Sequence, residues 1–162
     1  MDFNLGERVV HPSFGIGKVI TVEEMVFNGQ APSPFYRVVF GKTTLWVPVN
    51  PNKVGGIRPI TPVKDLRRYR LLLKSAPAQL DDNFRKRQEQ LEVRLGYGTF
   101  QALCEVVRDL SARVQIKNLN KFETALLKQT REALVQEWAL ASGLSPGEAG
   151  IDIDRSLQKG RQ

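Results

Sequence analysis

The pattern of hydrophobic and polar positions divides the chain into two parts with different periods. Between residues 5 and 60, short runs rich in branched and aromatic residues alternate with glycine and proline, which predicts short β-strands joined by tight turns. Asn28-Gly29 has the composition of a hairpin turn, and Pro48, which cannot donate to a ladder, is expected at a sheet edge. This part is predicted to be a small, strongly curved antiparallel sheet or barrel, and residues 50–60 are expected to form the loop that leads out of it.

From Thr61 onward the apolar residues recur at helical spacing. Thr61-Pro62 has the form of a helix start. The expected helices cover residues 64–74, 84–95, 100–114, 121–141 and a short segment from 146. Gly96 is expected to end the second of them as a left-handed cap. Together the two parts predict an α+β chain, with a β domain over residues 1–62 and a compact all-α domain of four or five helices over residues 63–162.

One aromatic residue stands beside three cations in the stretch Asn83-Phe84-Arg85-Lys86-Arg87. Asp81 and Asp82 precede it and are expected to cap the helix that begins there. In one interpretation Phe84 is a wedge for the minor groove of DNA, and the cations hold the flanking phosphates. In the other, Phe84 is the first core residue of an amphipathic helix whose basic face is solvated. These five residues alone favour the second interpretation, because charged helix faces are common.

Basic residues outnumber acidic ones. The chain holds 24 Lys and Arg against 17 Asp and Glu, a net charge of +7, and residues 64–141 hold 15 of the basic and 10 of the acidic residues. Because the surplus is concentrated in the helical part, it raises the expectation of a polyanionic partner such as DNA for that part.

Residues that carry catalysis or bind metals are scarce. Cys104 is the only cysteine and His11 the only histidine, which leaves no disulfide, metal cluster or Cys/His nucleophile pair. Gly15-x-Gly17 is interpreted as a bulge or barrel corner, because no helix follows it to hold a phosphate. We expect no catalytic residue, metal, cofactor or small-molecule substrate, and therefore no enzyme. With no secretory leader and no apolar run of the ~20 residues that span a membrane, a cytoplasmic protein without membrane partners is expected.

An ordered set of short motifs over roughly residues 1–142 resembles one protein family. In the β part the matching residues are Gly6-x-x-Val9-Val10-x-Pro12-x-x-Gly15-x-Gly17, Asn28-Gly29, Phe35-Tyr36, Val47-Pro48-Val49 and Gly56-Ile57-Arg58. In the helical part they are Asn83-Phe84 with the basic run after it, and Glu105-Val106-Val107-Arg108-Asp109-Leu110. In this order they resemble the CarD/CdnL family of bacterial RNA polymerase-binding transcription regulators, whose N-terminal module is shared with the transcription-repair coupling factor.

The resemblance implies that the β domain is a Tudor-like barrel that binds the β lobe of the RNA polymerase β subunit. Its edge strand would pair with a strand of that lobe, so that main-chain hydrogen bonds supply affinity. The residues that align with this surface are Met25, Phe27, Thr44, Trp46 and Pro48. Family members often carry arginine where Met25 and Trp46 stand, so a more hydrophobic contact is expected if these two are exposed.

The resemblance also implies that the helical domain contacts promoter DNA at the upstream edge of the transcription bubble. There a family tryptophan enters the minor groove, and the equilibrium between closed and open promoter complexes shifts. The corresponding residues here are Phe84 for the wedge and Arg85, Lys86 and Arg87 for the phosphates. Phenyl has less stacking area than indole and lacks its N–H donor, so weaker stabilisation of the fork is expected.

The alternative is a stand-alone nucleic-acid-binding protein, since small barrels also bind nucleic acid. Such a protein would bind free duplex without polymerase, whereas a protein tethered to polymerase can bind DNA weakly and still act. The residues do not say which promoters respond, or whether the effect is activation or repression. They also leave open the domain orientation, the oligomeric state and the role of residues 143–162.

Overall fold

The chain folds into two compact units, residues Met1–Ile60 and Thr61–Gln162. The structure is a computed structural model and describes residues 3–49 and 56–160. Part of the expected loop at 50–60 therefore lies outside the described residues. Each unit has its own hydrophobic core, and the chain passes from one unit to the other close to the position at which the sequence pattern changes.

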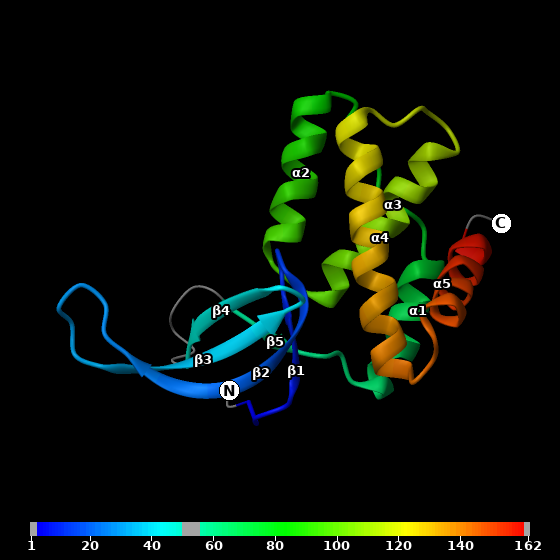
Figure 1. Ribbon diagram of the computed structural model, residues 1–162. Coiled ribbons are helices and arrows are strands. Elements are labelled where there is room, and N and C mark those ends of the chain that lie inside the picture. Colours follow the sequence, from blue (N-terminus) through cyan, green and yellow to red (C-terminus); the bar gives the residue numbers. More distant parts are fainter. Residues whose placement is uncertain (1–2, 50–55, 161–162) are drawn as a thin grey trace. The chain divides into compact units, whose positions relative to one another are not determined.

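The first unit is an antiparallel five-stranded sheet in the order β4-β3-β2-β1-β5 (Figure 1). The strands are β1 Arg8–His11, β2 Gly15–Met25, β3 Ser33–Phe40, β4 Thr43–Pro48 and β5 Arg58–Pro59. The pairing of β2 with β3 shifts register between Val19 and Thr21, and a bulge of this kind bends the strand and increases its twist. As expected, Pro48 ends an edge strand.

The core of the β unit lies on one face of this sheet. Val19, Val38 and Val47 are buried there, because residues two apart on a strand point to the same face. Gly17 lies beside Phe40, and a Cβ at Gly17 would come within 2.5 Å of that ring. Gly17 is therefore needed for close packing. The Gly15-x-Gly17 pattern has a structural role in the sheet, as the sequence analysis interpreted it.

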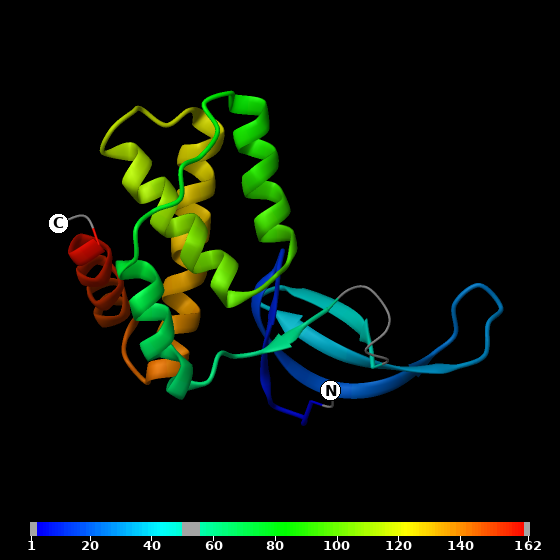
Figure 2. The same ribbon diagram turned by 180° about the vertical axis from the view of Figure 1, so that it is seen from behind.

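The second unit consists of five helices (Figure 2). A short 3-10 turn, Val63–Asp65, leads into them. The helices are α1 Leu66–Lys74, α2 Phe84–Gly96, α3 Phe100–Val114, α4 Lys121–Ser142 and α5 Pro146–Gly160. The last helix was expected to be short and instead has 15 residues. The α+β class, with a small antiparallel sheet followed by helices, is confirmed.

Side chains cap the starts of four of these helices, α2 to α5, and two expectations about the ends of α2 are wrong. Asn83, and neither Asp81 nor Asp82, caps α2: its Oδ1 accepts from the backbone N–H groups of Arg85 and Lys86 at 3.0 and 3.2 Å. An amide oxygen at this position satisfies two of the free N–H groups of the first turn. Gly96 is the last helical residue of α2, and the left-handed glycine that follows the helix is Gly98.

The core of the helical unit is built mainly by α1, α3, α4 and α5. Leu66, Phe100, Leu134 and Ile153 are buried in it. Trp138 is fully buried in the same cluster and is therefore a core residue. A second cluster of Leu91, Val106 and Leu110 packs α2 against α3.

Candidate functional site

The open edge of the sheet is formed by β4, and its hydrogen-bonding positions follow from the register. The Val49 N–H donates to the Pro34 carbonyl at 3.2 Å, and β3 and β4 pair without a register shift. Hydrogen-bonded and non-hydrogen-bonded pairs alternate along an antiparallel ladder. The even-numbered residues Thr44, Trp46 and Pro48 therefore direct their free backbone groups toward the open edge. Pro48 has no N–H and is the natural end of such an edge.

The five residues expected to bind polymerase share one face of the sheet, opposite the core of the β unit. Cross-strand neighbours form two rows on this face, Thr21–Arg37–Trp46 and Glu23–Phe35–Pro48. Met25 lies two positions after Glu23 and Thr44 two positions before Trp46, so both point to the same face. Phe27, in the loop after β2, packs against Phe35 with ring centroids 5.2 Å apart. The structure thus places all five on the same side of the sheet.

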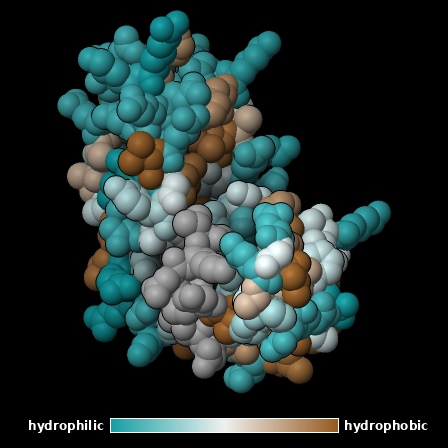
Figure 3. All heavy atoms as spheres, turned by 90° about the vertical axis from the view of Figure 1, so that its left-hand side faces the viewer, coloured by the Kyte–Doolittle hydropathy of each residue, from teal (hydrophilic) through white to brown (hydrophobic). Residues whose placement is uncertain are grey.

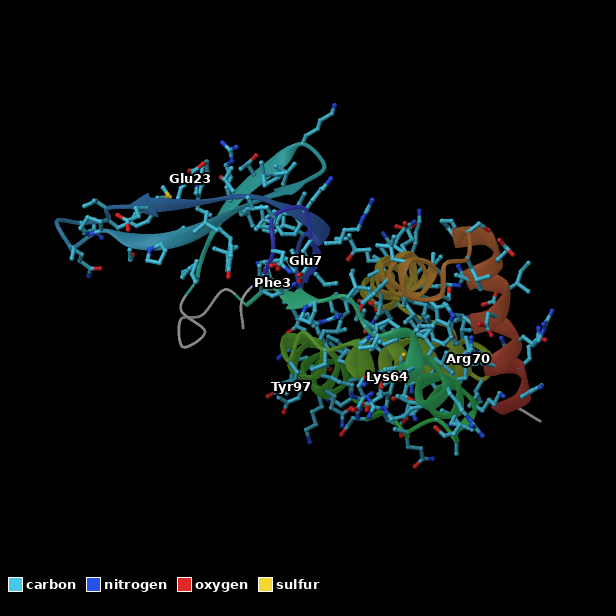
Figure 4. The ribbon with its side chains drawn as sticks, turned by 90° about the horizontal axis from the view of Figure 1, so that it is seen from below. Phe3, Glu7, Glu23, Lys64, Arg70 and Tyr97 are labelled. Atoms are coloured by element: carbon cyan, nitrogen blue, oxygen red, sulfur yellow. The ribbon has the colours of Figure 1, made fainter. Side chains whose placement is uncertain are left out.

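Trp46 is exposed and is held by a carboxylate on its own face. Trp46 is 43% exposed, and its Nε1–H donates to Glu23 Oε2 at 3.0 Å. Figure 4 labels Glu23 on the strands of the β unit. Glu23 also accepts from the Thr21 hydroxyl at 2.9 Å and pairs with Arg37 at 3.4 Å. The hydrogen bond from Trp46, followed by that from Thr21, lowers the pKa of Glu23. Because its indole N–H is already bonded, the Trp46 side chain offers a partner its ring face and no donor.

Phe84 occupies the first position of α2 and is 57% exposed. The interpretation of Phe84 as a core residue is therefore wrong. The Arg85 guanidinium carbon lies 5.8 Å from the centre of the Phe84 ring, and Lys86 is exposed beside it. Over residues 3–49 and 56–160, neither Arg85 nor Lys86 forms an ion pair. An exposed ring and two uncompensated cations thus start the helix together.

Arg87 does not belong to this exposed group, which corrects the expectation that it binds phosphate. It is buried, its Nε lies 2.8 Å and its Nη2 2.7 Å from Glu123 Oε1, and the remaining Nη1 donates to the Asp81 and Asp82 carbonyls at 2.9 and 3.0 Å. All of its guanidinium nitrogens are thus bound within the protein. Its role is to hold the segment that leads into Phe84.

The Arg87–Glu123 pair also brings the starts of α2 and α4 together. Glu123 lies in the first turn of α4, three residues after Asn120, which is the spacing of a capping box. The Asn120 side chain does accept from the Glu123 N–H at 2.8 Å. The Glu123 carboxylate, however, binds Arg87. A carboxylate buried this deeply is stable only beside a cation, which explains why the Glu123 carboxylate binds Arg87.

Two cations missed by sequence analysis lie at the same end of the helical unit. Lys117 follows α3 and binds Asp82 at 3.2 Å, and this contact lowers the pKa of Asp82. Lys121 is exposed at the first position of α4. The N-termini of α2 and α4 add partial positive charge there. Figure 1 shows both helices beginning at the same end of the unit, and Figure 3 shows mostly hydrophilic residues at that end. Nothing in the sequence spacing relates Lys121 to Phe84.

The Arg108-Asp109 motif acts as a structural clamp. The buried Asp109 carboxylate binds Arg94 at 2.6 Å and Arg108 at 2.8 Å, and accepts from the Ala78 N–H at 2.9 Å. These bonds attach α2 and the segment after α1 to α3. A buried carboxylate with three donors is satisfied within the protein, so the role of Asp109 is structural.

Comparisons with known proteins match most of the chain to two family models. Residues 3–61 match the family described as CarD-like/TRCF RID domain, and residues 69–154 match the family described as CarD, C-terminal domain. The Bacillus subtilis (strain 168) protein named "Putative transcription factor YdeB" is 24% identical over 144 residues, which cover 88% of this chain and 94% of that protein. Over the described part of the chain, no helix is long and apolar enough to cross a membrane. The two family matches together cover both units, and the chain belongs to the CarD family of RNA polymerase-binding transcription regulators.

Proposed function

We propose that this chain binds the β lobe of the RNA polymerase β subunit through β4, and contacts promoter DNA at the upstream edge of the transcription bubble through Phe84. Binding at both sites shifts the equilibrium between closed and open promoter complexes. The exposure of Phe84 carries the proposal, because this large aromatic side chain is 57% exposed and belongs to none of the hydrophobic clusters found among the described residues of its unit.

The edge of β4 supports the polymerase contact. Free backbone groups at Thr44 and Trp46 suit an added strand from the partner, and the proline at position 48 limits how far the pairing extends. Two side chains on the adjoining face, Phe27 and Trp46, are large, aromatic and exposed. Large aromatic side chains in such positions are frequent anchors of protein interfaces.

The start of α2 supports the DNA contact. An apolar ring inserted at a base step unstacks it at a cost of roughly a few kcal/mol, which contacts to the flanking phosphates offset. Arg85, Lys86 and Lys121 are exposed for such contacts. Arg87 and Asn83 hold the helix start in place before DNA arrives, so little conformational entropy remains to be lost on binding.

Tethering explains why the DNA contact can be weak. A second site on the same particle binds at an effective concentration of about a millimolar, so a few phosphates and one ring are sufficient once the β unit is docked. The protein then stabilises whichever promoter state presents the distorted upstream step, without any chemical reaction.

Open-complex lifetime on a linear promoter fragment tests the proposal. Phe84→Ala should shorten it, and Phe84→Trp, with its larger stacking area, should lengthen it, while binding to the isolated β lobe stays the same for both. Tyr97→Ala, which removes another exposed aromatic near the far end of α2, is the matched control and should change neither quantity. Equal lifetimes for all variants would remove Phe84 from the mechanism. Equal binding of free duplex with and without polymerase would favour the stand-alone alternative.

A further inference from the structure

The two sides of α1 have different surroundings. One side is anchored in the helical unit by the buried residues Leu66 and Leu73 and by Arg70. Arg70 binds the Asp152 carboxylate of α5 at 2.9 Å. The other side carries exposed cations, Arg67 and Arg68 in α1 and Lys64 in the turn before it. Figure 4 labels Lys64 and Arg70.

Much of the net charge of the chain is concentrated here. Residues 63–75 contain five cations and one acid, a net charge of +4, in a chain with a net charge of +7. The cations are Lys64, Arg67, Arg68, Arg70 and Lys74, and the acid is Asp65. The positive side chains in these 13 residues repel one another. This repulsion destabilises the folded state unless a partner compensates the charge.

Most arginines elsewhere in the helices form close ion pairs. Arg70, Arg87, Arg94, Arg108 and Arg131 each have an acidic partner at 3.2 Å or less. By contrast, within residues 3–49 and 56–160 Lys64, Arg67 and Lys74 form no ion pair, and Arg68 reaches Asp65 only at 4.0 Å. Arg68 is instead placed by Tyr69, whose hydroxyl accepts from its Nη2 at 3.0 Å. This face of α1 is cationic and uncompensated.

We propose that this face, Lys64, Arg67, Arg68 and Lys74, is a second DNA-contacting surface that binds the phosphate backbone of duplex DNA independently of Phe84. Guanidinium and ammonium groups are the donors that phosphate oxygens accept. From Lys64 to Lys74 a helix rises about 15 Å, which matches the phosphates of about four base pairs along one strand.

The chemistry of this face fits a nucleic acid better than a membrane. An interfacial helix inserts a broad apolar side into lipid, whereas the apolar side of α1 is buried in the helical core and only Leu71 is a large apolar residue on its exposed side. Figures 1 and 2 place α1 and the start of α2 at different ends of the helical unit. The two surfaces can therefore be tested separately.

The experiment measures binding of the full chain to a fork-free duplex without polymerase, by fluorescence anisotropy from about 50 to about 200 mM salt. The logarithm of the binding constant falls with the logarithm of the salt concentration by about 0.9 for each phosphate contact. Arg67→Gln with Arg68→Gln should therefore weaken binding and make this slope shallower by about 1.8. Arg8→Gln with Lys42→Gln, which removes the same charge from exposed positions of the β unit, is the control and should leave the slope as it is.

Phe84→Ala separates this inference from the proposed function, because duplex binding should not change in that variant even though the open complex is affected. An unchanged slope in the Arg67/Arg68 variant would overturn the inference, as would an equal change in the Arg8/Lys42 control, which would mean that only net charge counts. Weaker binding to polymerase with unchanged duplex binding would assign the face to an acidic protein surface instead, and would also overturn it. Thermal unfolding of each variant shows that the helical unit remains folded.

Discussion

Arg87 and Glu123 form a buried ion pair, with their nearest atoms 2.7 Å apart and side chains 8% and 2% exposed. The pair joins the first turns of α2 and α4, and the same arginine binds the two carbonyls that precede the helix of Phe84. The position of the exposed Phe84 ring therefore depends on the buried charge of Arg87.

Removing one partner of this pair should destabilise the helical unit strongly. Glu123→Ala leaves the Arg87 guanidinium buried without its counter-charge, and such losses cost about 3–5 kcal/mol. Urea unfolding followed by circular dichroism measures the free energy of unfolding. Arg85→Gln and Lys86→Gln, on the exposed face beside it, are the controls and should change the free energy of unfolding by less than about 0.5 kcal/mol. Comparable losses for all three would mean that the buried pair has no special role.

Trp46→Ala should weaken binding to the isolated β lobe by roughly tenfold, a typical loss for an aromatic anchor. Because the indole makes an apolar contact, the salt dependence of binding should hardly change. Surface plasmon resonance at two salt concentrations gives both quantities. Val22→Ala is the control, since Val22 is exposed but lies in the row of Tyr36, on the opposite face. An unchanged affinity for Trp46→Ala would show that the ring lies outside the interface.

Gly17→Ala should destabilise the β unit, because its Cβ would meet the Phe40 ring at 2.5 Å. Overpacking of this kind costs about 1–3 kcal/mol. The expected result is a lower midpoint of thermal unfolding for the β unit. Gly56→Ala serves as the control, since a Cβ at Gly56 meets nothing within 4 Å. A midpoint equal to that of the wild type for Gly17→Ala would mean that Phe40 moves aside without cost.

Asp152 should make the helical unit sensitive to acid. Burial raises the pKa of its carboxyl, but hydrogen bonds from Arg70 and Trp138 outweigh burial and hold the pKa below its ordinary value of 3.8. A lowered pKa in the folded state means that the stabilisation is fully present above this ordinary value and is lost as the pH falls through the folded value. Thermal unfolding between neutral pH and about pH 2 should therefore show a steeper loss in the wild type than in Asp152→Asn. Parallel curves would contradict this assignment.

The sequence predicted the elements well where the physical rule is local. The helix starts at Phe84, Phe100 and Lys121 follow residues whose side chains cap the next turn, a contact that spans two or three positions. The strand that ends at Pro48 is limited by a missing N–H. Gly96 shows the limit of such rules, because Gly98 lies two positions further on and has the same conformational freedom, so the composition does not distinguish them.

The sequence by itself determined the two-part organisation of this protein, its basic helical half and the aromatic residue at the start of α2, because these depend on composition and on periods of a few residues. Only the tertiary structure decided that Arg85 and Lys86 face solvent while Arg87 is buried. Arg87 is separated from Glu123 by 36 residues, and a charge is buried only where folding brings such a partner to it. The same holds for Met25, Trp46 and Phe27, whose common face arises from the register of three strands, and for Lys121, which lies at the same end of the unit as Phe84 only after α4 has packed against its neighbours.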